Sequence, residues 1–204
     1  MSALPRIGVL ASGEGTNLQA LLDQLHGRDV EVAAVASDKP GAGALARAEA
    51  AGVEHAVFPL SDHADRAARD GAIADWLQAH GVELVVLAGY MALLSEPFLA
   101  RFPDRVVNVH PALLPAFPGI RSVEQAVDYG VKVFGVTVHL VDAGVDTGPI
   151  ILQRAVELRD AVDADAVRAA LRPLEHALLP EAVRLLVAGR VRRDPANARR
   201  LLVE

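Results

Sequence analysis

Short apolar runs alternate with segments whose apolar residues have helical spacing along most of this 204-residue chain. Residues 6–11 form the first apolar run, and Leu18, Leu21, Leu22 and Leu25 then occupy positions i, i+3, i+4 and i+7 of a helix. Strands that alternate with helices in this way are typical of a parallel sheet with crossover helices. We therefore expect an α/β fold, with a mostly parallel, twisted sheet of about seven strands, helices on both faces and an antiparallel C-terminal hairpin.

The same two periodicities predict the remaining elements. Strands are expected at residues 30–36, 53–58, 84–87, 106–110, 133–141 and 150–156, and helices at residues 44–51, 96–102 and 123–129 and before Gly81. A last helical region starts near Asp163, and we expect Pro173 and Pro180 to kink or split it, because proline removes a backbone donor. No linker or repeat interrupts the pattern, so residues 1–204 are predicted to form one domain.

Composition excludes several classes of protein. Hydrophobic residues make up 52 % of the chain but aromatic residues only 4 %, so the core must be aliphatic. No apolar run approaches the roughly 20 residues of a membrane-spanning helix, and no secretory signal is visible, so we expect no membrane and a cytoplasmic location. The net charge of −6 argues against a nucleic-acid partner. One basic cluster lies near the C-terminus, and we interpret it as a solvated end segment: Arg190, Arg192, Arg193, Arg199 and Arg200.

The first candidate site is the sequence SGEGTN, which starts at Ser12, directly after the first strand, and opens a helix. Amide groups at a helix N-terminus bind anions, and two glycines let the backbone approach a phosphate closely. The segment lacks the Lys-Ser/Thr pair of a P-loop, and Leu18 stands where a dinucleotide fingerprint has its third glycine. Phosphate binding is therefore one interpretation, and an ordinary glycine turn is the other.

The second candidate is Asn108 and His110, which alternate onto one face of a strand, roughly 6.6 Å apart, and are followed by Pro111. Both stand at the carboxyl end of that strand, where ligands bind in open α/β sheets. Histidine transfers protons near neutral pH, and an amide can donate to a developing oxyanion. The alternative is a histidine packed against a proline-rich loop.

The third candidate is a Gly-rich loop that contains Asp142 and Asp146. Aspartates among glycines suit a hairpin turn, but a buried aspartate near an imidazole would also orient the ring and favour its protonated form. His139 shares a strand face with Thr137 and is interpreted as structural. The chain has no cysteine and its histidines lack metal-ligand spacing, so no metal site is predicted.

Together these segments resemble the phosphoribosylglycinamide formyltransferases, folate-dependent enzymes of purine synthesis with a Rossmann-like formyltransferase fold. The matching sequences are SGEGTN from Ser12, LAGYMALL from Leu87, NVHPALLPAFPG from Asn108, GVTVH from Gly135 and DAGVDTGPIILQ from Asp142. The resemblance extends from the first strand to about residue 180. Ala112 is a departure, because many relatives have serine after the His-Pro pair.

The resemblance implies a reaction and a catalytic group. The amine of glycinamide ribonucleotide would attack the formyl carbon of 10-formyltetrahydrofolate, without a formyl-enzyme. His110 would manage the proton and help to stabilise the tetrahedral oxyanion, Asn108 would donate to that oxygen, and Asp146 would hold His110 in place and favour its protonated form. A cis peptide bond is also implied between Leu114 and Pro115.

The resemblance also implies two binding sites. The ribonucleotide would contact Gly15, Thr16 and Asn17 through its phosphate, with Arg172 at a phosphate and Glu175 at the ribose. The folate would contact Arg66, Met91, Ala92, Leu93, Leu94, Asn108, Asp142, Ala143, Gly144, Val145 and Asp146. The resemblance further implies that the N-terminal half holds the ribonucleotide-phosphate site and the C-terminal half the folate site, although each set includes residues of the other half. The expected partners are these two small molecules, and the enzyme would act as a monomer or homodimer without a metal.

Other functions remain as alternatives at this point. Methionyl-tRNA formyltransferase and formyltetrahydrofolate deformylase share the Asn-x-His and Asp arrangement, but each has an extra domain that 204 residues do not accommodate. A non-enzymatic nucleotide-binding module would keep the glycine loop but would not need Asn108, His110 and Asp146.

Overall fold

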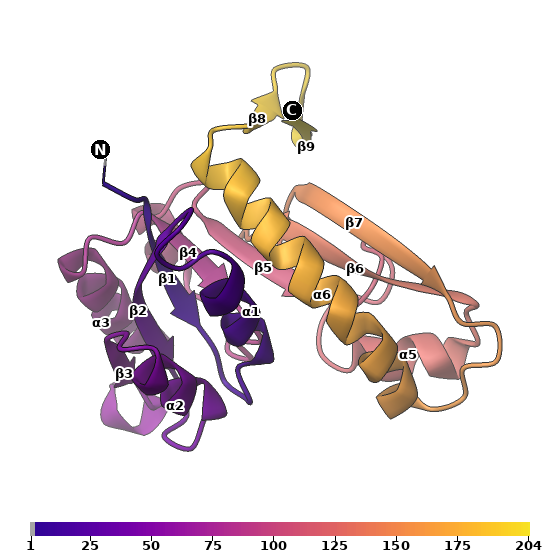
Figure 1. Ribbon diagram of the computed structural model, residues 1–204, viewed down its shortest axis with the longest axis horizontal. Coiled ribbons are helices and arrows are strands. Elements are labelled where there is room, and N and C mark those ends of the chain that lie inside the picture. Colours follow the sequence, from indigo (N-terminus) through magenta and orange to yellow (C-terminus); the bar gives the residue numbers. More distant parts are fainter. Residues whose placement is uncertain (1–2) are drawn as a thin grey trace. The chain divides into compact units, whose positions relative to one another are not determined.

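The computed structural model describes residues 3–204 and contains two compact units, the first ending at Asn108 and the second running from Val109 to Glu204 (Figure 1). One sheet has seven strands, in the order β3 (His55–Val57), β2 (Glu31–Ser37), β1 (Arg6–Leu10), β4 (Leu84–Leu87), β5 (Val106–His110), β6 (Val133–Leu140) and β7 (Ile150–Glu157). A second sheet pairs β8 (Val191–Asp194) with β9 (Asn197–Val203). The pairs β1–β2, β1–β4, β2–β3 and β4–β5 are parallel, whereas β6–β7 and β8–β9 are antiparallel. The expected α/β class, the mostly parallel sheet and the antiparallel hairpin expected from the strands at residues 133–141 and 150–156 (β6 and β7) are confirmed.

Strands and helices alternate in the first unit. Its elements are β1 (Arg6–Leu10), α1 (Thr16–Gln24), β2 (Glu31–Ser37), α2 (Gly43–Ala50), β3 (His55–Val57), η1 (Leu60–Asp62), α3 (Arg66–Ala79), β4 (Leu84–Leu87) and α4 (Glu96–Arg101). The boundary between the units falls inside β5 (Val106–His110). All four residues of β4 are buried, as expected for a strand with β1 on one side and β5 on the other. The third strand is shorter than the predicted residues 53–58.

Two neighbouring strands of this unit bring the candidate loops together at one edge. Because β1 and β4 are adjacent and parallel, the loops after them leave the sheet at the same end. The Ser12 amide donates to the Gly89 carbonyl at 3.0 Å, which joins the two loops directly. The loop after β1 contains Gly15, and the loop after β4 contains Met91.

The second unit contains α5 (Ser122–Tyr129), β6 (Val133–Leu140), β7 (Ile150–Glu157), α6 (Ala164–Val187), β8 (Val191–Asp194) and β9 (Asn197–Val203). The long helix α6 packs against β6 and β7 (Figure 1). Asp163 caps its N-terminus, because the carboxylate accepts the amides of Asp165 and Ala166. Among the described residues, no helix has both the length and the apolar character that a membrane crossing requires.

Pro173 and Pro180 were expected to kink or split the last helix, and the expectation of a split is wrong. Helix α6 runs through both Pro173 and Pro180 as one 24-residue helix. An internal proline costs about 3 kcal/mol, but the apolar face of α6 buries side chains before and after both prolines, among them Leu171, Leu178 and Val183. Packing against the two strands therefore overrides the local cost.

The basic cluster near the C-terminus is not an irregular end segment. It lies in and beside the hairpin of β8 and β9, and most of its side chains are exposed. Arg200 pairs with Asp194 across this hairpin, and Arg192 pairs with Glu204. The solvated character of the cluster was predicted, whereas its strand pairing was not.

Candidate functional site

The loop between β6 and β7 holds Asp146 in a fixed position through contacts of its own. Asp142 Oδ1 accepts the Gly144 amide at 3.1 Å and the Thr147 hydroxyl at 2.6 Å. A Cβ atom on Gly148 would lie 1.7 Å from the Leu140 carbonyl oxygen, so only glycine fits there. Asp146 has a φ of 51°, in the left-handed region that aspartate tolerates better than most residues.

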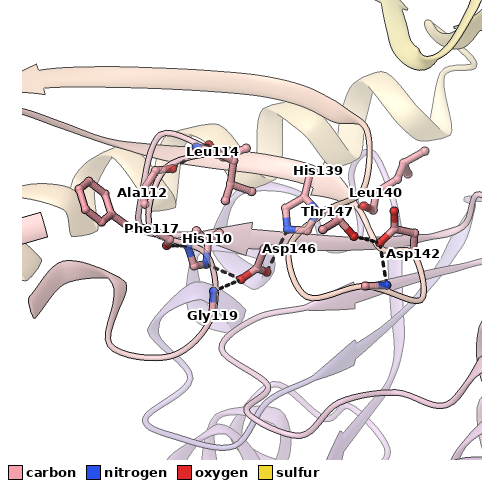
Figure 2. Close-up of polar contacts among 12 residues, drawn as sticks. His110, Ala112, Leu114, Phe117, Gly119, His139, Leu140, Asp142, Asp146 and Thr147 are labelled. Atoms are coloured by element: carbon pink, nitrogen blue, oxygen red, sulfur yellow. Dashed lines mark hydrogen bonds and ion pairs between the residues drawn. The ribbon is translucent and has the colours of Figure 1, made fainter. Parts of the chain in front are cut away.

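Asp146 lies between two histidine rings of the second unit (Figure 2). Its Oδ2 atom is 3.3 Å from Nδ1 of His110, and its Oδ1 atom is 3.5 Å from Nε2 of His139. Both rings are buried, and the aspartate side chain is only 14 % exposed. The Gly119 amide donates to Oδ2 at 2.7 Å. The carboxylate is therefore held from three sides.

The remaining ring nitrogens of the two histidines face carbonyl oxygens. His110 Nε2 is 2.9 Å from the Phe117 carbonyl, and His139 Nδ1 is 2.8 Å from the Leu140 carbonyl. A carbonyl oxygen only accepts hydrogen bonds, so each of these nitrogens carries a hydrogen when the bond forms.

The surroundings of Asp146 also favour its own charged form. Burial by itself would raise the pKa of this carboxyl, but hydrogen bonds from His139 and the Gly119 amide and the charges of His110 and His139 outweigh burial and lower the pKa to about 2. Asp146 is therefore an anion at neutral pH.

The segment after β5 positions the groups around His110. The Leu114–Pro115 bond is cis, as the resemblance implied. Phe117 has a φ of 53°, which is unusual for a bulky residue, and its carbonyl faces the imidazole. The buried Thr137 hydroxyl accepts the Leu114 amide at 3.1 Å and donates to the Ala112 carbonyl at 2.7 Å. Strand β6 thus fixes this segment through Thr137. The same strand contacts Asp146 through His139.

In the first unit, Gly15 precedes α1, and Thr16 and Asn17 form the start of that helix. Gly15 has a φ of 75°, and a Cβ atom there would lie 2.6 Å from the Ala44 backbone. The loop is therefore packed closely against α2, and glycine is required for that approach. Amides at the N-terminus of a helix have no helical acceptor, which suits an anion.

The predicted folate residues of the first unit lie on α3 and after β4. Met91 and Leu93 are exposed although apolar, whereas Ala92 and Leu94 are half-buried. The Met91 amide donates to the Ser12 hydroxyl at 2.9 Å. Arg66 is the first residue of α3, and its side chain is exposed.

Arg172 and Glu175 lie on α6 in the second unit. Arg172 is exposed and Glu175 is half-buried. Burial lowers the pKa of the adjacent His176, against the opposing effect of the Glu175 charge.

The predicted folate residues Ala143, Gly144 and Val145 are exposed at the tip of the loop after β6.

Sequence reasoning missed two parts of these sites. His139 was interpreted as structural, and its contact with the Asp146 carboxylate, which sequence reasoning did not find, is compatible with that interpretation. The available signal was a pair of polar residues, Thr137 and His139, on one face of an otherwise apolar strand. The other part is Ser12 with Asp38, whose carboxylate accepts the Ser12 hydroxyl at 2.6 Å.

Within residues 3–204, no group of three or more histidine, aspartate or glutamate side chains is arranged to hold a metal ion.

This geometry is suited to acid–base and oxyanion chemistry. An imidazole next to an anionic carboxylate is suited to proton transfer, and for His110 this requires Nε2 to leave the Phe117 carbonyl and face the reacting group. Asn108 lies two residues before His110 on β5, and its amide is a hydrogen-bond donor of the kind that stabilises an oxyanion.

Comparisons with known proteins agree in one family. A model of the formyl transferase family matches residues 5–183. The chain is 47 % identical over 186 residues to a phosphoribosylglycinamide formyltransferase of Mycobacterium tuberculosis, covering 91 % of this chain and 86 % of that protein. It is 40 % identical to the Bacillus subtilis enzyme of the same name, covering 90 % and 95 %. The crystal structure of glycinamide ribonucleotide transformylase 1 from Symbiobacterium toebii has a TM-score of 0.94 and 47 % identity, covering 100 % and 95 %.

Proposed function

This chain belongs to the formyl transferase family, and from that premise we propose that it is a phosphoribosylglycinamide formyltransferase. In this reaction the formyl group of 10-formyltetrahydrofolate passes to the amine of N1-(5-phosphoribosyl)glycinamide. The products are formylglycinamide ribonucleotide and tetrahydrofolate, in purine synthesis. The cytoplasmic location expected from the sequence remains part of this proposal.

The observation that carries the proposal is the contact between His110 and the anionic Asp146. Formyl transfer develops negative charge on the formyl oxygen when the amine attacks, and the attacking amine must then lose a proton. A protonated His110 supplies positive charge at the first stage, and Asn108 supplies a neutral donor. Asp146 keeps the imidazole oriented and favours its charged form.

Direct transfer needs no nucleophilic side chain to carry the formyl group. The amine attacks the formyl carbon, a tetrahedral intermediate forms, and the carbon–nitrogen bond to the folate breaks. Protonated His110 gives its proton to the folate nitrogen as the carbon–nitrogen bond breaks and then takes one from the attacking amine, so the protons balance. The main contribution of the protein is then to orient two substrates and to stabilise charge.

The binding residues form two sets in the proposal. The start of α1, with Gly15, Thr16 and Asn17, takes the ribonucleotide phosphate, and Arg172 and Glu175 take a phosphate oxygen and the ribose. The folate contacts a second set of residues, Arg66, Met91, Ala92, Leu93, Leu94, Asn108, Asp142, Ala143, Gly144, Val145 and Asp146. The helix N-terminus at Gly15 and the exposed apolar side chains of Met91 and Leu93 support this division.

A spectrophotometric assay tests the proposal. Purified protein is mixed with a 10-formyl folate analogue whose absorbance changes when the formyl group leaves. We expect the change only when glycinamide ribonucleotide is present. A change without the acceptor would indicate a deformylase, and no change with both substrates would contradict the proposed function.

A further inference from the structure

A buried ion pair on α3 lies apart from the histidines and aspartate described above. Arg69 and Asp70 are adjacent, 3 % and 0 % exposed, and joined by two hydrogen bonds from the guanidinium to Asp70 Oδ1, at 2.7 and 3.0 Å. Removing two charges from water costs several kcal/mol per ion, so such a pair needs further hydrogen bonds. Its other contacts therefore indicate what the pair does.

Those contacts all go to the loop after β4. Asp70 Oδ2 accepts the Ser95 amide at 2.7 Å, and Arg69 Nη2 donates to the Leu93 carbonyl at 3.4 Å. The guanidinium also lies 6.0 Å from the centre of the Tyr90 ring, within the range of a cation–π contact. The pair thus contacts the backbone of this loop at two points, the Leu93 carbonyl and the Ser95 amide, and one of its side chains, Tyr90.

The near end of the same loop is fixed separately. Ser12 is buried, and its hydroxyl accepts the Met91 amide at 2.9 Å while it donates to Asp38 at 2.6 Å. Between these attachments, Met91 is 62 % exposed and Leu93 is 55 % exposed. The backbone is held on the protein side, and the large apolar side chains remain accessible.

We propose that Arg69 and Asp70 are positioning residues for folate binding, because they fix the backbone of residues 91–95 and so present Met91 and Leu93 to the donor. The inference rests on the proposed function, in which residues 91–94 bind the folate. The pair does not touch the reacting atoms in this account. Its effect is on donor affinity, since a binding segment that loses its support loses preorganisation.

The test compares Arg69→Met, which keeps the aliphatic stem and removes the guanidinium, with Asp70→Asn. Asparagine has only one side-chain oxygen, so it cannot accept the Arg69 guanidinium on one oxygen and the Ser95 amide on the other. Arg69→Lys is the conservative variant, because one ammonium keeps the charge but lacks the fork that reaches both Asp70 and Leu93. The matched control is Asp75→Asn. Asp75 lies on the same helix, α3, and pairs with Arg101 of α4 at 2.7 Å, but its side chain is 74 % exposed.

We expect Arg69→Met and Asp70→Asn to raise the KM for the folate donor at least tenfold, with the KM for glycinamide ribonucleotide and kcat within about twofold of wild type. Arg69→Lys should lie between these variants and wild type, and Asp75→Asn should match wild type. Hydrogen exchange without substrates should be faster than in wild type in the peptide that contains Met91 and Ser95 in Arg69→Met and Asp70→Asn, intermediate in Arg69→Lys and unchanged in Asp75→Asn.

Several outcomes would overturn the inference. Unchanged donor KM with a lower Tm would reduce the pair to a structural role, and equal increases in both KM values would indicate a general defect. If Arg69→Met does not fold, Asp70→Asn and Arg69→Lys decide the question by the same criteria. Failure of wild-type protein to transfer formyl groups would instead contradict the proposed function, and the hydrogen-exchange comparison would still report whether the pair holds the segment.

Discussion

One oxygen of Asp146, Oδ2, accepts the Gly119 amide at 2.7 Å and lies 3.3 Å from Nδ1 of His110. The aspartate therefore links the loop after β6 to the segment after β5, within the second unit (Figure 2). An aspartate that served only the turn would need neither contact. The turn role belongs to Asp142, which accepts the Gly144 amide and the Thr147 hydroxyl.

Replacement of Asp146 by asparagine should lower kcat by roughly 10²-fold or more. Asparagine keeps the size and the turn conformation but removes the charge that supports protonated His110. Steady-state kinetics measures the effect, and circular dichroism checks the fold. Asp128→Asn is the control, because Asp128 is an exposed residue of α5. Near-normal turnover in Asp146→Asn would return this residue to a turn role.

Asp146 should also make stability depend on pH. Its pKa is lowered from an ordinary 3.8 to about 2 in the folded chain. Ionised Asp146 therefore stabilises the fold at neutral pH, by about 2 kcal/mol, and this contribution is lost as the pH falls from about 4 toward 2. Urea unfolding at pH 7 and at about pH 2.5, near the lower end of that window, should show that the gap in unfolding free energy between wild type and Asp146→Asn narrows in acid. A gap that stays constant with pH would contradict the charge effect.

Gly15→Ala should weaken ribonucleotide binding more than folate binding. The added Cβ atom would lie 2.6 Å from the Ala44 backbone at a φ of 75°, so the loop must move to accept it. The left-handed conformation alone costs alanine roughly 1–2 kcal/mol. Separate KM values for the two substrates measure the effect. Gly13→Ala is the matched control, since a Cβ atom there has no neighbour within 4 Å.

Equal changes in both KM values for Gly15→Ala would indicate a loss of folding rather than of phosphate binding. An unchanged ribonucleotide KM would leave the loop with only a turn role.

Pro173→Ala should stabilise the second unit, because Pro173 is exposed within α6. Alanine restores a backbone donor and removes the ring clash, which can raise the free energy of unfolding by up to about 3 kcal/mol. The greater freedom of the unfolded chain without proline offsets about 0.4–1 kcal/mol of this gain. Pro180→Ala should gain less or lose stability, since Pro180 is buried and its packing is lost. Tm values of the two variants provide the comparison. A lower Tm for Pro173→Ala would show that the helix depends on this proline.

The strands of the large sheet were predictable because burial leaves a local pattern. The run of four apolar residues in β4 and the alternation of Asn108 and His110 with valines in β5 both show in the sequence. The cis bond before Pro115 followed only from resemblance to a family, since no local pattern requires it. The contact of His110 with Asp146 joins residues 36 positions apart in the numbering, and sequence reasoning reached it by the same resemblance.

The features that were missed depend on contacts between distant segments. Helix α6 continues through Pro173 because of its packing against β6 and β7, and no rule for a single segment contains that energy. The hairpin of β8 and β9 is rich in arginine and mostly exposed, so it lacks the apolar alternation that marks a strand. Arg69 and Asp70 look like an ordinary charged pair on a helix until the loop after β4 is placed beside them.

The most direct test of the account is the rate at which His110→Ala makes formylglycinamide ribonucleotide from 10-formyltetrahydrofolate and glycinamide ribonucleotide, with the product measured by mass spectrometry. Wild-type protein should form the product, and His110→Ala should lower kcat by roughly 10²-fold or more with little change in either KM. Asn108→Ala should behave in the same way. Absence of product with wild-type protein, or normal turnover with a raised KM in His110→Ala, would contradict the account.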